Sequence, residues 1–70
     1  MKLEYDREAD AVYIRIKDAD IATTRELEEN VIVDIDASGK LVGIELLFVS
    51  DYLRPEEIQN LTITELPASA

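Results

Sequence analysis

The sequence lacks three residue types that carry much of protein chemistry, because it contains no cysteine, no histidine and no tryptophan. Without cysteine there can be no disulfide, and without cysteine and histidine the usual zinc sites are excluded. A general base near neutral pH would have to be a carboxylate with a strongly raised pKa. Ser38 and Ser50 have no evident partner that would activate them as nucleophiles. We therefore expect no catalytic residue, no cofactor and no enzymatic activity.

Basic residues are also scarce, since seven lysines and arginines stand against 16 acidic residues and the net charge is −9. No cluster of basic side chains could neutralise phosphates, and the overall negative field would repel nucleic acids and anionic membranes. A small basic protein or a metal cation would be attracted instead. The same charge is also typical of a small protein that is simply kept in solution.

Long hydrophobic segments are absent as well. The longest apolar-rich run, residues 41–49, contains Glu45 and is too short to span a bilayer. Residues 1–6 include no apolar stretch of the length that a signal peptide needs. A cytoplasmic protein without a membrane partner is expected.

The length of 70 residues limits the core. We expect one domain over residues 1–66 and a frayed tail over residues 67–70. A domain of this size buries only roughly 60% of the surface that its unfolded chain exposes. Such a core rarely supplies more than about 3–5 kcal/mol of stability. Because disulfides and Cys/His metal clusters are excluded, oligomerisation is the remedy left, and a homodimer is the favoured form.

Alternating polar and apolar residues predict strands at 2–5, 11–17, 31–35 and 41–48. Residues 23–29 are typical of either a weaker strand or a helix, because glutamate and leucine are adequate helix formers. Residues 62–66 could form a last strand or an extended tail. Both alternatives stay open at the level of the sequence.

The sequence around Pro55 is typical of a helix start, since proline suits the first helical position and two glutamates follow it. A short turn is expected just before it, from Ser50 to Leu53. Ile58 and Leu61 would then share one helix face and could cover the sheet. The predicted fold is α+β: a small antiparallel β-meander of four to five strands with one or two short C-terminal helices.

The register of the hairpin formed by residues 31–48 follows from its apolar positions. If the alternate apolar residues of both strands share one side, Val33 must lie opposite Ile44. This pairing requires a four-residue loop, residues 37–40, or an equivalent bulge. Gly39 suits that turn because glycine adopts positive φ without a steric cost.

One pattern in this hairpin resembles a calcium-binding loop. The template D-x-[DN]-x-[DN]-G-x₅-E is matched except at its third ligand, and the candidate ligands are Asp34, Asp36, Ser38, the Lys40 carbonyl and Glu45. An EF-hand loop lies between two helices, whereas the flanking residues here favour strands. We therefore predict a turn that resembles the motif, and keep divalent-cation binding as an alternative function.

The side of the predicted sheet away from the apolar residues is the candidate interface. Tyr13, Arg15 and Ile32 should project from it, and a mixture of aromatic, cationic and apolar side chains is typical of an interface. If the helix covers the apolar side, this second side stays partly open. An ordinary solvated face, with Arg15 paired across strands to acids such as Asp34 and Glu45, explains the same residues equally well.

Several short sequence words recur in the order and with the gaps of a known family. They are Tyr5-Asp6-x-Glu8-Ala9-Asp10-Ala11-x-Tyr13-Ile14, Val31-Ile32-Val33-Asp34-x-Asp36-x-x-Gly39, Val42-Gly43-Ile44-Glu45-x-Leu47 and Ser50. Over about residues 3–53 the chain resembles the small prokaryotic family called domain of unknown function 2283. The resemblance implies a cytoplasmic, compact, mostly β protein with no assigned activity, cofactor or catalytic residue. Similar short proteins are sometimes thought to act as antitoxin-like partners of small basic toxins.

The acids and glycines in these words have simple structural interpretations. Asp6, Asp10 and Asp36 are predicted to lie beside turns, and Gly43 to allow a close approach of strands. Our hypothesis is a non-enzymatic, small acidic interaction module that associates with itself. The alternatives are an antitoxin-like partner of a small basic protein and a divalent-cation-binding protein.

Overall fold

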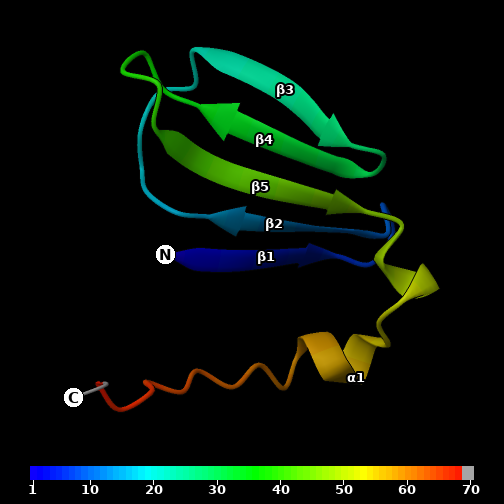
Figure 1. Ribbon diagram of the computed structural model, residues 1–70. Helices are drawn as coiled ribbons and strands as arrows, with labels where there is room; N and C mark the ends of the chain where they lie inside the picture. The colour runs from blue at the N-terminus through cyan, green and yellow to red at the C-terminus, as the bar shows by residue number, and fades with distance from the viewer. Residues whose placement is uncertain (69–70) are drawn as a thin grey trace.

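The computed structural model describes residues 1–68, and its main element is a five-stranded antiparallel sheet (Figure 1). The strands are β1 (Lys2–Asp6), β2 (Ala11–Arg15), β3 (Thr23–Glu28), β4 (Val31–Ile35) and β5 (Leu41–Leu47). A 3-10 helix, η1 (Val49–Asp51), and one short helix, α1 (Pro55–Ile58), follow the sheet. The predicted α+β class is confirmed.

The strand order is β1-β2-β5-β4-β3, so the sheet is a meander only in part. Strands β3, β4 and β5 follow one another as neighbours, and β1 pairs with β2 as a hairpin. The connection from β2 to β3, however, leads to the opposite edge of the sheet (Figure 1). Composition is consistent with this order, because β3 is mostly polar and suits an exposed edge, whereas β2 begins with Ala11 and Val12, which are buried between two neighbouring strands.

The predicted pairing of Val33 with Ile44 is confirmed. The register then shifts between Asp34 and Ile35, so that Ile35 lies opposite Leu41 and β5 carries one extra residue. The structure thus has the bulge that the sequence analysis gave as the alternative to a four-residue loop. The turn is closed by a hydrogen bond of 2.8 Å from the Asp36 amide to the Lys40 carbonyl, and Gly39 has a φ of 84°.

Both open alternatives have an answer in the structure. Residues 23–28 form a strand, so the helical alternative is wrong there. Pairing with β4 provides hydrogen-bond partners for the backbone, and this outweighs a weak helical preference. Residues 61–68 contain no helix or strand, so the extended-tail alternative applies to residues 62–66. Part of the expected frayed tail, residues 69 and 70, lies outside the described residues.

The predicted helix begins where expected. Pro55 is its first residue, and the backbone amide of Arg54 donates a hydrogen bond of 3.0 Å to Glu57 Oε1. This contact and the nearby Arg54 side chain hold the pKa of Glu57 below its usual value. The helix is only four residues long, and within residues 1–68 no helix has the length and apolar character needed to cross a membrane.

The hydrophobic core is very small. The buried apolar residues are Ala11, Val12, Val42 and Val49. Strand pairing places six apolar positions, Val12 among them, on one side of the sheet, which we call the apolar face: Val12, Ile14, Val31, Val33, Ile44 and Leu46. Of these six, only Val12 is buried; the others are half-buried.

The helix covers only part of this apolar face. Side chains of α1 and of the residues around it share an apolar groove with Leu3, Val12, Ile14 and Leu46, which belong to β1, β2 and β5. In Figure 1, α1 and the segment after it lie on the β1 side of the sheet, away from β3 and β4. The expectation that the helix would cover the apolar face is therefore wrong for β4. A single turn of helix is too small to span a sheet of five strands.

Candidate functional site

The opposite side of the sheet, which we call the second face, is organised around Gly43 on β5. Gly43 is buried, and Tyr13 of the neighbouring strand β2 lies against it. A Cβ atom at this position would overlap the Tyr13 hydroxyl group and would lie 2.8 Å from Tyr13 Cε2. Glycine is therefore required so that the tyrosine ring can lie flat across β5.

The tyrosine reaches a carboxylate on the strand beyond β5. Its hydroxyl group donates a hydrogen bond of 2.7 Å to Asp34 Oδ2 on β4. The other oxygen of Asp34 accepts a hydrogen bond of 2.7 Å from Thr24 Oγ1 on β3. One carboxylate thus links three strands, β2, β3 and β4.

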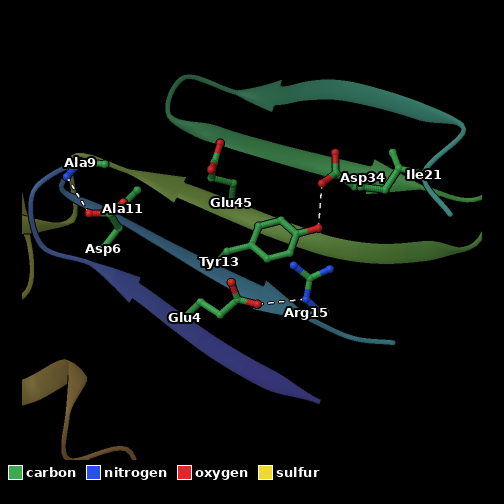
Figure 2. Close-up of a pocket in the computed structure, with 9 residues that line it drawn as sticks. All are labelled: Glu4, Asp6, Ala9, Ala11, Tyr13, Arg15, Ile21, Asp34 and Glu45. Atoms are coloured by element: carbon green, nitrogen blue, oxygen red, sulfur yellow. Dashed lines mark hydrogen bonds and ion pairs between the residues drawn. The ribbon is translucent and has the colours of Figure 1, made fainter. Parts of the chain in front are cut away.

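An arginine continues this network toward β1. Arg15 Nε lies 3.0 Å from Glu4 Oε1, and the guanidinium carbon is 5.0 Å from the centre of the Tyr13 ring. The second distance is typical of a cation–π contact. The contacts of Glu4, Arg15, Tyr13, Asp34 and Thr24 therefore cross the sheet from β1 to β3, as the labelled side chains in Figure 2 show in part.

The network also shifts the pKa of two of its members. Burial and the hydrogen bond to Asp34 raise the pKa of Tyr13 above its ordinary value. The contact with Glu4 raises the pKa of Arg15. Tyr13 is consequently a neutral hydrogen-bond donor near pH 7 and Arg15 a permanent cation, so neither can accept a proton there.

A hollow of about 380 Å³ opens beside the network (Figure 2). Its lining includes the carboxylates of Glu4, Asp6, Asp34 and Glu45 and one cationic side chain, Arg15. Ala9 and Ala11 contribute small side chains, and Ile21 and Tyr13 contribute larger ones. The hollow is therefore mostly acidic.

The three interface candidates, Tyr13, Arg15 and Ile32, all lie on the second face, but they do not all line the hollow. Tyr13 and Arg15 are half-buried and line the hollow. Ile32 is half-buried on β4, opposite Glu45, and is not among the lining residues. The structure thus places two of the candidates in a fixed polar network and the third beside it.

The acidic loop between β4 and β5 is held by Asp36. Its Oδ1 accepts hydrogen bonds from the Ser38 amide, the Ser38 hydroxyl and the Lys40 amide, at 2.9, 2.7 and 2.9 Å. Its Oδ2 pairs with Lys17 Nζ from the end of β2. The lysine and these donors hold the pKa of Asp36 well below its usual value. The carboxylate therefore stabilises the loop in its charged form.

The candidate calcium ligands are not brought together. Asp34 is engaged on the second face, Asp36 and Ser38 bond to each other in the loop, and Glu45 lies across from Ile32. No group of three or more acidic side chains within residues 1–68 is arranged to hold a metal ion. Asp34 and Glu45 line the hollow of the second face, whereas Asp36 and Ser38 lie in the loop, so the candidates do not form one set of ligands.

A second acidic residue, Asp10, joins the turn between β1 and β2 to η1, and sequence reasoning identified it only as a turn residue. Asp10 has a φ of 55° and accepts hydrogen bonds from the Ser50 amide and hydroxyl at 2.9 and 2.6 Å. Its carbonyl accepts a bond of 3.1 Å from the Val49 amide. Forty residues separate the two partners, so no local pattern reveals the pairing. The family words contain both residues, and this was the only signal.

Comparisons with known proteins add a family but no activity. The family model described as "Protein of unknown function (DUF2283)" matches residues 2–50. Neither the curated proteins nor the solved structures include a match to this chain. The matched range contains all five strands, the Tyr13–Asp34 network and the Asp10–Ser50 contact, and ends before α1.

Proposed function

From the premise that the chain belongs to the DUF2283 family, whose function is unknown, we propose that it is a non-enzymatic interaction module that associates with itself. A homodimer is the form that the geometry supports best. Its interface is the apolar face of the sheet, and the single observation that carries the proposal is the amount of surface left exposed by one copy.

One copy exposes more surface than is typical of a folded monomer of its size. Its solvent-accessible surface is 5674 Å². A folded monomer of 7.9 kDa is expected to expose about 4,400 Å², so the excess is about 1,300 Å². A standard protein interface buries about 800 Å² on each partner. The excess is therefore large enough to supply one such interface.

The shape of the chain supports the same conclusion. Its radius of gyration is 14.0 Å, whereas about 11 Å is expected for a compact domain of this length. The smallest of its three extents is 21 Å, against 43 and 34 Å for the others. A sheet with only one turn of helix beside it lacks the second layer that domains use to bury a sheet face.

The exposed surface has the composition of an interface core. Val31 and Val33 on β4 and Ile44 on β5 are half-buried within one copy and adjoin one another. Aligned face-to-face packing of two sheets would bury these side chains in a layer about 10 Å thick. Complete burial of one such side chain contributes about 1.5–3 kcal/mol.

The polar groups of the second face support a structural role rather than catalysis. Asp34 accepts hydrogen bonds from two strands, and Arg15 is paired with Glu4. Both oxygens of the Asp34 carboxylate therefore accept hydrogen bonds that join strands, which supports a role in holding the sheet together.

The test compares two variants at neighbouring positions. Val33→Lys places a charge on the apolar face, whereas Ile32→Lys places the same charge on the opposite face of the same strand. Sedimentation at micromolar concentration should show a dimer for the parent protein and for Ile32→Lys. Val33→Lys should raise the dimer dissociation constant about tenfold or more, because loss of the buried contact exceeds about 1.4 kcal/mol.

Circular dichroism of both variants controls for folding. A parent protein that stays monomeric at these concentrations would contradict the proposal. A dimer broken by Ile32→Lys and not by Val33→Lys would move the interface to the second face, where Tyr13, Arg15 and Ile32 lie.

A second candidate function is an antitoxin-like partner of a small basic protein. The observation that favours it is the acidic hollow, in which four carboxylates accompany one arginine within a chain of net charge −9. Glu45 is the lining carboxylate for which no hydrogen bond within residues 1–68 is found, so it is open to a lysine or arginine of a partner. Binding should weaken as salt rises and in Glu45→Gln, because contacts between exposed charges are screened. Capture that is insensitive to both would contradict this candidate.

A further inference from the structure

We infer that the C-terminal segment, residues 61–67, of each copy docks on β4 of a second copy. This inference rests on the proposed self-association and specifies which parts of the two chains meet. The segment is exposed and apolar, Val31 and Val33 of β4 are half-buried within one copy, and the segment lies on the β1 side of the sheet, away from β4.

The C-terminal segment has the composition of a strand or a docking peptide. Leu61, Ile63 and Leu66 are 64%, 83% and 79% exposed. Leu61 and Ile63 alternate with Thr62 and Thr64, so the apolar pair can face one way while the threonines face the other. Exposure of three large apolar side chains within six residues is unfavourable in water, and a partner surface would remove it.

Within one copy this segment finds only part of a surface. Leu61 and Ile63 border an apolar groove of about 300 Å³ that also includes Met1, Leu3 and Ile14. The groove therefore belongs to β1, β2 and the N-terminus, and Leu66 does not reach it. In Figure 1 the segment runs along the β1 side of the sheet toward the N-terminus.

The uncovered part of the apolar face lies beyond the reach of the same copy's segment. Strands β2 and β5 separate β1 from β4. At about 4.8 Å per strand, β4 lies roughly 14 Å from β1 across the sheet. The residues that line the grooves beside α1 and the segment include none from β4. A second chain must therefore supply what covers Val31 and Val33.

Two-fold symmetry brings the two open surfaces together. Most dimers are related by a two-fold axis. If that axis runs parallel to the strands between two facing apolar faces, β1 of each copy lies above β3 of the other. The α1 helix and the C-terminal segment, on the β1 side, then fill the space above the partner's β4. The contact between the C-terminal segment and β4 then occurs twice in the dimer, once for each copy. The apolar face of each sheet is covered over β4 as well as over β1.

The absence of cysteine allows a direct test by disulfide cross-linking. The Ile63→Cys variant is mixed with the Val33→Cys variant and oxidised, and the mixed disulfide is quantified by mass spectrometry. Cysteines join only if their Cα atoms come within about 7 Å. The matched control replaces Val33→Cys with Ile32→Cys, which projects from the opposite face of β4. The mixed disulfide should form at least fivefold more with Val33→Cys than with Ile32→Cys.

Equal yields with both partners would overturn the inference. A second measurement uses Ile63→Asp and Thr62→Asp, which add the same charge to neighbouring positions of the segment. Ile63→Asp should raise the dimer dissociation constant about tenfold and Thr62→Asp less than threefold. A parent dimer that both substitutions leave unchanged would refute the docked segment but not self-association, whereas a monomeric parent protein would refute the proposed function itself.

Discussion

The most specific consequence of the structure is that replacement of Gly43 by alanine should be costly because of Tyr13. An alanine Cβ would overlap the tyrosine hydroxyl group and ring, so the ring must move away from β5. The hydrogen bond of 2.7 Å to Asp34 and the cation–π contact with Arg15 are then lost.

The size of the effect follows from these contacts. A hydrogen bond to a charged group contributes about 1.5–3 kcal/mol, and this one is half-buried, so the lower end applies. The cation–π contact, between two half-buried side chains, adds about 0.5–1 kcal/mol. Alanine recovers about 0.5 kcal/mol, because it restricts the unfolded chain more than glycine does. We expect a net loss of about 1.5–2 kcal/mol from Gly43→Ala.

Urea unfolding at one fixed protein concentration measures this loss. With a slope of about 1 kcal/mol per molar, the midpoint should fall by about 1.5–2 M. A fixed concentration is needed because association contributes to apparent stability.

The control repeats the substitution in a Tyr13→Ala background, where no ring lies over Gly43. There the same substitution should change the free energy of unfolding by less than about 0.5 kcal/mol. Equal losses in the two backgrounds would refute the reasoning, because they would show that the glycine serves the backbone and not the tyrosine.

Three further predictions concern the acidic turns and the tyrosine. Asp10→Ala should lower the free energy of unfolding by about 1–2 kcal/mol. Asp10→Asn should lower it by less, because asparagine tolerates the positive φ of 55° and keeps one hydrogen-bond acceptor. Equal losses of the two variants in urea unfolding would contradict this prediction. Lys17 and the loop donors lower the pKa of Asp36, so the contribution of this carboxylate to stability is present above about pH 4 and is lost as the pH falls. The melting temperature of Asp36→Asn should therefore change less between neutral and acidic pH than the melting temperature of the parent protein. Because the pKa of Tyr13 is raised, the contribution of its hydroxyl group to stability is present below about pH 10 and is lost at higher pH. Ultraviolet absorbance should show one tyrosine that ionises at a higher pH than the others. A titration curve that Asp34→Asn leaves unchanged would contradict the assignment of that tyrosine to Tyr13.

The exposed edges of the sheet are compatible with the proposed face-to-face dimer. Strand β3 is an edge with a register shift between Glu26 and Glu28, and it carries charged side chains along its length. Bulges and charges at an edge hinder pairing with a further strand. Association through the apolar face is therefore favoured over extension of the sheet beyond β3.

Much of the fold could be predicted from local patterns. Alternation of apolar residues predicted β2, β4 and β5, and the match of their apolar sides predicted the pairing of Val33 with Ile44. These features depend on a period of two residues that each strand carries within itself. The start of α1 at Pro55 could also be predicted from local sequence, because the residues that favour a helix start lie within its first turn.

The arrangement of the site could not be read in this way. Tyr13 and Asp34 are 21 residues apart, and Asp10 and Ser50 are 40 residues apart. The first pair meets because β5 lies between β2 and β4, an order that follows from the burial of each strand and not from the sequence of neighbours. The sequence predicted that Gly43 allows a close approach of strands, whereas in the structure it is the side-chain ring of Tyr13 that lies against the glycine.

The sequence by itself determined four of the five strands, the acidic charge and the absence of cysteine and histidine chemistry, because these are properties of single residues or of short periods. The tertiary structure decided which apolar surface stays open. A helix of four residues on the β1 side of a five-stranded sheet does not reach β4, so it leaves Val31 and Val33 half-buried on the part of the apolar face that it does not cover. Coverage depends on the distance between elements in space, and no local pattern in the sequence encodes that distance.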